Sequence, residues 1–474
     1  MSKIEVNAVE PQCGTTLTLG ASGDTVTIPA GATISNLGTA AGFGSTGEVS
    51  WNTTVKTANF TATSGSGFFV NTAGGAVTVT LPASPSAGNV VAVSDYNGSA
   101  STNNITIARN SSNINGSADN LIVSKANSAV QLVYVDATTG WQNVTTANPN
   151  DVTNPFIVAT GGTITCCGDF KIHTFTGPGT FTVSNAGSPS GSNTVSYVVI
   201  GGGGAGGGDD DGAGGGAAGG FRESKAATDC YSASPLNATS GPTYNLAVSV
   251  QGYPITVGGG GSSNPQNTPY NMPQGAGNPS TFSTITSAGG GDGGLGNHPG
   301  PSTPAPTNAN GTPGGSGGGG GTFFPGSPGQ GTVGSGNTPP VSPPQGNNGG
   351  TGATDNNTYR IGGGGGGAGG VGESRSPSCN ASAGGGGNGI STSITGSPVT
   401  RAGGGGGGGH PGGSRPGGGA GPGGGGTGGG GPPGATAGAG TANTGSGGGG
   451  NGAGGGGVSG AGGSGVVIIR YKFQ

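Results

Sequence analysis

One short stretch of the sequence has residue types and spacing that are typical of nucleotide binding. Residues 197–208 read YVVIGGGGAGGG, and Gly201, Gly203 and Gly206 match the pattern G-x-G-x-x-G. In dinucleotide-binding proteins such glycines form a tight turn, and the helix that follows holds the pyrophosphate at its N-terminus. Here the next residues are GGDDDGAGGGAAGG. Each glycine in a helix interior destabilises the helix by up to about 1 kcal/mol relative to alanine, so no helix is expected to begin here. The sequence therefore argues against a bound nucleotide, and we expect no cofactor.

The other reactive side chains form no catalytic or metal-binding pattern. His173, His298 and His410 are far apart, and the five cysteines lack zinc-ligand spacing, so we expect reduced, structural thiols. The carboxylates of 209–211 suit either a Ca²⁺ ion or a solvated acidic turn. No strand–turn–helix context supports a serine nucleophile. We predict that the protein is not an enzyme and holds no metal, although a carboxylate pair of the glycosidase type stays open.

The composition differs from that of an ordinary soluble domain. Glycine accounts for 121 of the 474 residues and proline for 33, and only 6% are charged, against about 25% in typical domains. The net charge of −4 argues against a nucleic-acid partner. No apolar run is long enough to span a bilayer, and the first residues lack a secretory apolar region. We expect a protein that is made in a cytoplasm and works outside the cell.

Short strand-like segments separated by turn residues dominate the first 200 residues. Residues 1–47 contain TTLTLG and DTVTIP, which are too short to bury a core in one chain, so we expect a fibrous stem made with other chains. Residues 48–148 have the strand density of a β-sandwich-like module, in which VDATTGW returns Trp141 to the core. Residues 149–200 form a further β unit that leads into the glycine-rich region.

Glycine runs alternate with variable segments throughout 201–474, and an apolar strand over 466–473 closes the chain. Such runs are either flexible chain or packed polyglycine II helices, whose backbone groups bond to neighbouring helices. The runs have similar lengths, and the apolar segments 197–200 and 466–473 could pair and hold the ends together. We therefore predict a mainly β fold with packed polyglycine II helices and essentially no α-helix.

Three segments resemble parts of bacteriophage fibre proteins. FKIHTFTGPGTFTVSNAG, with the closing GAGGSGVVIIRYKFQ, resembles the glycine-rich domain of tail fibres and of T-even-type tip adhesins, where polyglycine helices present loops to the host. GFFVNTAGGAVTVTLP is similar to a β module of phage fibres, and MSKIEVNAVEPQCG to an N-terminal segment of marine phage fibres. The resemblance implies a homotrimeric tail fibre in the virion. It would attach to tail or other virion proteins through its N-terminus and bind a host glycan or outer-membrane protein.

The resemblance also implies that loops between the glycine runs contact the receptor. Aromatic side chains pack on sugar faces and are enriched among residues that dominate binding. The candidates on these loops, with Arg375 as a further polar partner, are Tyr231, Tyr270, Phe323, Phe324, Tyr359, Arg360 and His298. Tyr253 instead suits anchoring of its own loop. A head or neck fibre or decoration protein without receptor binding shares all these features, and a glycan-degrading tail spike is the remaining alternative.

Overall fold

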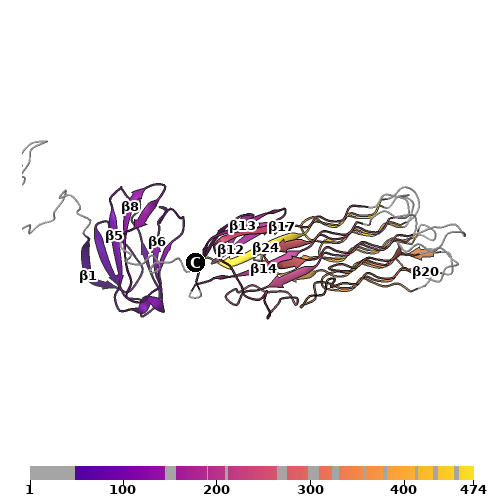
Figure 1. Ribbon diagram of the computed structural model, residues 1–474, viewed down its shortest axis with the longest axis horizontal. Coiled ribbons are helices and arrows are strands. Elements are labelled where there is room, and N and C mark those ends of the chain that lie inside the picture. Colours follow the sequence, from indigo (N-terminus) through magenta and orange to yellow (C-terminus); the bar gives the residue numbers. More distant parts are fainter. Residues whose placement is uncertain are drawn as a thin grey trace, which may run out of the picture.

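The computed structural model describes residues 49–144, 156–188, 191–208, 212–263, 275–296, 309–322, 330–355, 359–376, 382–410, 415–430, 436–452 and 458–474. Within these ranges the fold is all-β, as predicted, with a short 3₁₀ segment at Ser99–Ser101 and no sheet closed into a barrel. No helix there is long and apolar enough to cross a membrane. The molecule is elongated, with a first β unit followed by a second unit that continues into long glycine-rich segments (Figure 1). The predicted stem over 1–47 lies outside the described residues.

The first β unit consists of two sheets that enclose one hydrophobic core. The first sheet has the order β1 (Ser50–Lys56), β3 (Ser66–Val70), β5 (Val90–Asp95), β8 (Ala129–Asp136) and β9 (Gly140–Asn143). The second has the order β2 (Phe60–Thr61), β4 (Val77–Thr80), β6 (Ile105–Ala108) and β7 (Leu121–Val123). From β1 to β6 the chain alternates between the sheets, so adjacent strands in this part are parallel. In β4 the valines face the core and the threonines face outward, as the period-two pattern requires.

The predicted hairpin at VDATTGW is confirmed. Strands β8 and β9 are antiparallel, with Asp136 opposite Gly140, and Trp141 is fully buried. The turn is fixed by Asp136, whose Oδ1 accepts hydrogen bonds from the N–H groups of Thr138 (2.9 Å) and Thr139 (2.6 Å). Gly140 has a φ of 74°, which a side chain rarely permits.

The second β unit has two larger sheets. One has the order β10 (Ile157–Thr160), β13 (Gly179–Ala186), β17 (Gln251–Thr256), β18 (Ser280–Phe282) and β19 (Ile285–Ser287). The other has the order β11 (Thr163–Cys167), β12 (Phe170–Phe175), β24 (Val466–Lys472), β14 (Thr194–Ile200) and β15 (Phe221–Ser224), with β16 (Leu246–Ala247) also paired to β14. Two hairpins lie apart from these sheets: β20 (Ala353–Asp355) with β21 (Tyr359–Ile361), and β22 (Ile390–Thr392) with β23 (Val399–Arg401).

The two apolar segments that flank the glycine region pair as predicted. Strands β14 and β24 are antiparallel, with Ile200 opposite Val466 and Tyr197 opposite Ile469. One face of this sheet contributes to a core with the β13–β17 sheet, and the other packs under the loop that contains Tyr231 and the β22–β23 hairpin. The glycine region therefore begins after β14 and ends before β24, which are neighbouring central strands. Its first and last residues thus lie side by side.

The glycine runs are ordered segments that bond to one another with a period of three residues. In the run 201–208, the N–H groups of residues 201, 204 and 207 donate to residues 220, 217 and 214 of one neighbouring run, at 3.0, 2.8 and 2.9 Å. Residues 202 and 205 donate to a second neighbour, and residues 203 and 206 to a third. Since polyglycine II has three residues per turn and no internal hydrogen bonds, this pattern confirms the predicted lattice over the described residues.

Interior runs have six bonded neighbours each. The run 213–220 donates to 445–451, 288–294 and 363–366, and accepts from 201–207, 316–319 and 405–408. Three donor directions and three acceptor directions per turn produce this hexagonal arrangement. Neighbouring runs are therefore fixed relative to one another in every direction across the bundle.

Glycine is required in the lattice because the backbones approach too closely for a side chain. A Cβ atom placed on Gly203 would lie 2.0 Å from the carbonyl oxygen of Ser446, and one on Gly206 would lie 1.9 Å from that of Gly449. Both distances are far below van der Waals contact, and the obstructing atoms belong to backbone that is itself hydrogen-bonded. The glycine content of the sequence is thus a packing requirement of this bundle.

Candidate functional site

The ends of many glycine runs meet at one end of the bundle, which we call the distal face. Gly207 donates to Gly214, Gly408 to Ala213, and Asn451 to Gly207, at 2.7 to 2.9 Å. A Cβ on Gly212 would lie 2.9 Å from the carbonyl carbon of Arg360, so the β20–β21 hairpin belongs to the same end. In Figure 1 this hairpin lies at the extremity of the molecule farthest from the first β unit. The distal face comprises the described residues at these run ends.

The G-x-G-x-x-G motif lies in the bundle interior and has no capacity for a phosphate. The N–H groups of Gly201, Gly203 and Gly206 donate to carbonyl oxygens of neighbouring runs at 2.9 to 3.0 Å. After the motif, the described residues 207–208 and 212–220 are not helical. A nucleotide would need those N–H groups to be directed at its phosphates, so the geometry excludes this interpretation of the motif.

Two predicted receptor residues lie on β21 at the distal face. Tyr359 is opposite Asp355 in the hairpin, and Arg360 is opposite Thr354. Arg360 is only 5% exposed, so it is buried and does not offer an accessible surface to a receptor. The side chain of Tyr359 is outside the described part of the structure.

Arg375 connects two runs close to the distal face. Its Nη2 donates to Glu373 Oε2 at 2.9 Å and to the carbonyl oxygen of Ala383 at 3.0 Å. The same Glu373 oxygen accepts from the N–H of Gly385 at 2.9 Å. The ion pair lies within the run 371–376, and its hydrogen bonds to Ala383 and Gly385 join this run to the run 382–389. The Arg375 side chain stays 23% exposed.

Four further candidates lie outside the described residues, namely Tyr270, His298, Phe323 and Phe324, as does the acidic segment 209–211. Described residues that flank the segment 209–211, His298 and Phe323 are at the distal face. For example, the N–H of Gly296 donates to the carbonyl oxygen of Gly208 at 3.2 Å, and Thr322 Oγ1 donates to the carbonyl oxygen of Gly212 at 3.3 Å.

Tyr231 and Tyr253 are parts of cores near the base of the bundle. Tyr231 is 6% exposed and lies with its ring 5.6 Å from the guanidinium of Arg470. Its burial does not support the prediction that it faces a receptor, and we assign it to packing. Tyr253 is 8% exposed, and its hydroxyl oxygen accepts from the N–H of Ser249 at 2.8 Å. That contact agrees with the anchoring role predicted for Tyr253.

Sequence reasoning missed Arg415, which also lies near the distal face. Its backbone N–H donates to the carbonyl oxygen of His410 at 3.1 Å, across the ends of two glycine runs. The side chain of Arg415 is buried. The available signal was its position between two glycine runs, in a region with few charged residues.

Metal-ligating side chains and cysteine thiols are the remaining reactive groups in the described ranges. Those ranges contain no group of three or more histidine, cysteine, aspartate or glutamate side chains placed to hold a metal ion. Cys166, Cys167 and Cys230 are free thiols, and the other two cysteines lie outside the described ranges.

Asp292 is a carboxyl group buried within the glycine lattice. It is 0% exposed and interrupts the run 288–296, and its backbone N–H donates to Thr312 Oγ1 at 2.9 Å. Thr312 Oγ1 in turn donates to Asp292 Oδ1, while Oδ2 is buried with no hydrogen-bond partner in the structure. Burial raises the pKa of Asp292 to about 6 from 3.8, and the Thr312 hydrogen bond opposes this only in part.

We expect the bundle to lose stability as the pH rises from about 4 to about 6. The folded state keeps the Asp292 proton up to its raised pKa of about 6, whereas the unfolded chain releases it near 3.8. The full effect is about 3 kcal/mol, at 1.36 kcal/mol per pKa unit. Asp292→Asn should remove this pH-dependent contribution to stability. The unfolding free energy of the variant, relative to that of the wild type, should therefore increase as the pH rises from about 4 to about 6. Urea titrations of both proteins at pH 4, 5, 6 and 7 measure it, and a constant difference would contradict the prediction.

The chain is similar to a family of known proteins. Residues 174–472 match the model of a family described as a glycine-rich domain, and no curated protein matches the chain. The match starts within β12 and ends with β24, so it includes the closing strand pair and the bundle between them. Because the matched residues make up more than half of the sequence, the protein belongs to the glycine-rich domain family.

Proposed function

We propose that this protein is a tail-fibre component of a bacteriophage particle and adheres to the host cell surface through segments at the distal face. The observation that carries the proposal is the convergence of run ends on one face. The runs leave the β14–β24 strand pair, cross-bond in six directions, and bring residues distant in sequence together, as at Gly207, Gly214 and Asn451. A scaffold of this kind holds variable segments close together at the end of a long body.

Rigidity has a thermodynamic use in adhesion. Segments held at both ends by a bonded lattice lose less conformational entropy on contact than free loops would. Many copies on one particle convert weak single contacts into high avidity. The proposed contacts with a surface glycan or outer-membrane protein are Tyr270, Phe323, Phe324, His298 and Tyr359.

The proposal includes a homotrimer that attaches to other virion proteins through residues 1–47 and catalyses no reaction. Strand β1 supports contact with another chain, since residues 50–54 are exposed and Trp51 is 42% exposed beside Phe69. A large exposed aromatic side chain at a sheet edge is typical of a surface that a partner covers.

Competition with infection tests the adhesive function. Purified full-length protein, added to susceptible cells before the phage, should bind the cells and reduce infection in a dose-dependent manner, whereas heat-unfolded protein should do neither. Failure on every susceptible host would contradict adhesion. Antibody labelling of particles in electron microscopy should mark the tail fibres. Label on the head would instead favour the structural fibre or decoration protein, and release of sugar from host polysaccharide would favour a tail spike.

A further inference from the structure

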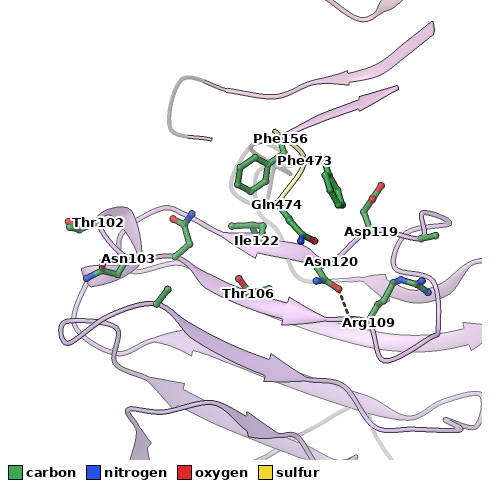
Figure 2. A pocket seen from close by; sticks show the side chains of 13 residues that line it. Thr102, Asn103, Thr106, Arg109, Asp119, Asn120, Ile122, Phe156, Phe473 and Gln474 are labelled. Carbon is green, nitrogen blue, oxygen red and sulfur yellow. Dashed lines mark hydrogen bonds between the residues drawn. The ribbon is translucent and has the colours of Figure 1, made fainter. Parts of the chain in front are cut away.

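A cavity of about 530 Å³ lies where the first β unit meets the end of the closing strand β24. Figure 2 shows Phe473 and Gln474 on one side and Thr106, Asn120 and Arg109 on the other. Thr106 and Ile122 are paired residues on the outward face of β6 and β7. The two units are joined beside the cavity by Lys171, whose Nζ lies 3.8 Å from Asp119 Oδ1 and 4.8 Å from the centre of the Phe473 ring. Lys171 thus contacts the first unit at this side, and the space next to it stays open.

The cavity wall combines hydrogen-bond donors and acceptors with two aromatic residues, Phe156 and Phe473. Asn120 Oδ1 accepts from the Arg109 N–H at 3.1 Å, which leaves its Nδ2 group to donate. Asn103 Nδ2 donates to the carbonyl oxygen of Thr72 at 2.9 Å, which leaves its Oδ1 to accept. Arg109 and Asp119 bring one positive and one negative charge, so these two lining residues together carry no net charge.

A second, smaller cavity of about 220 Å³ shares Asp119 and Asn120 with the first. Its lining is again rich in amides and hydroxyls, with Asn115, Ser184 and Asn185 among the residues. Two adjoining cavities of this composition provide room for a ligand that is longer than a single ring.

We propose that the cavity between the two β units binds a neutral oligosaccharide. Each sugar hydroxyl both donates and accepts hydrogen bonds, which matches a wall of amides, hydroxyls and one side chain of each charge. The C–H face of a sugar ring packs on an aromatic ring, here Phe473. The volume of about 530 Å³ falls in the range of about 300–1,000 Å³ that is usual for small-molecule sites. A polyanion would need a net positive wall, whereas the lining residues Arg109 and Asp119 carry opposite charges. An apolar ligand would cover the amide and hydroxyl groups of the wall without offering them partners.

This inference goes beyond the proposed function, because the cavity lies at the opposite end of the glycine-rich body from the distal face. The test is isothermal titration of the full-length protein with maltotriose, cellotriose and chitotriose, and with trigalacturonate as the anionic counterpart. At least one neutral trisaccharide should bind saturably, and the anionic one should bind at least tenfold more weakly. Lack of saturable binding by all three neutral probes, or binding of trigalacturonate alone, would overturn the proposal.

Two variants locate the bound sugar, and a matched variant provides the control. Phe473→Ala removes the stacking surface and should weaken binding at least tenfold. Thr106→Phe fills the cavity from the sheet and should abolish binding. Thr80→Phe places the same side chain on the outward face of the adjacent strand β4, at a position that does not line the cavity, and should change affinity less than twofold. Unchanged affinity in Thr106→Phe would contradict the site, even if host-cell adhesion by the distal face were intact.

Discussion

Alanine at Gly405 is expected to lower the free energy of unfolding by about 3 kcal/mol or more. The new Cβ would lie 2.0 Å from the carbonyl oxygen of Gly448 and 2.5 Å from its carbonyl carbon. That neighbouring run is held on both sides of the contact, because Gly447 donates to Gly403 at 3.0 Å and Gly450 to Gly406 at 2.8 Å. Added volume in a packed core usually costs about 1–3 kcal/mol, and here the obstructing atom is fixed backbone. Urea unfolding midpoints and resistance to protease digestion measure the effect.

Gly419→Ala is the matched control for Gly405→Ala. Gly419 belongs to the same class of run, but a Cβ placed there meets no atom within 4 Å. Its alanine variant should therefore change stability by no more than about 0.5 kcal/mol, as most surface substitutions do. Equal stability of the two variants would mean that the runs do not pack as described. A low yield of folded Gly405→Ala beside a normal yield of Gly419→Ala would support the packing.

The lattice tolerates alanine at particular positions only. Ala205, Ala217 and Ala218 are 0% exposed within the interior runs. These methyl groups have space because neighbouring positions lack side chains; a Cβ on Gly275, for example, would lie 2.9 Å from Cβ of Ala205. Glycine at one position thus complements alanine at another, and exchange of either residue affects both runs.

The sequence was sufficient to predict several strands and turns whose side chains form a recognisable pattern. The apolar character of 197–200 and 466–473 predicted their pairing, and the turn residues of VDATTGW predicted the hairpin at Trp141. The alternation of glycine runs with variable segments predicted the lattice as a class of structure. In each case a local pattern, either apolar periodicity or turn chemistry, specified the local structure.

The neighbours of each run could not be predicted, and the reason is physical. A run without side chains has no hydrophobic face, so nothing in the sequence distinguishes the partner of Gly215, which is Gly363, from any other glycine carbonyl. The burial of Tyr231 was missed for a related reason. Its segment lies between glycine runs and resembles the exposed loops, but its contact, Arg470, comes from the last strand of the chain. The cavity lined by Phe473 also combines residues from segments that are distant in sequence.

Arg470 joins three segments at the base of the bundle. From β24 its Nε donates to both carboxylate oxygens of Asp229, at 3.0 and 3.1 Å. Its Nη1 donates to the carbonyl oxygen of Ile394, in the turn between β22 and β23, at 3.3 Å. The guanidinium also lies 4.4 Å from the centre of the Phe170 ring. Asp229 accepts further hydrogen bonds from Ser196 Oγ at 2.8 Å and from the N–H of Cys230 at 2.8 Å. The closing strand, the loop over it and the β22–β23 hairpin are therefore fixed through one side chain.

Arg470→Met is expected to lower the free energy of unfolding by about 3–5 kcal/mol, because it leaves the Asp229 carboxylate buried without its cation. The side chains of the pair are only 3% and 1% exposed, so water cannot replace the lost partner. Arg470→Met combined with Asp229→Asn should recover most of the loss, since the double variant buries no charge. Lys472→Met removes a cation two residues along the same strand that is only half-buried, and should cost less than about 1 kcal/mol. Denaturant titration of the four proteins separates these contributions. If Arg470→Met costs no more than Lys472→Met, the ion pair does not hold the closing strand to the loop.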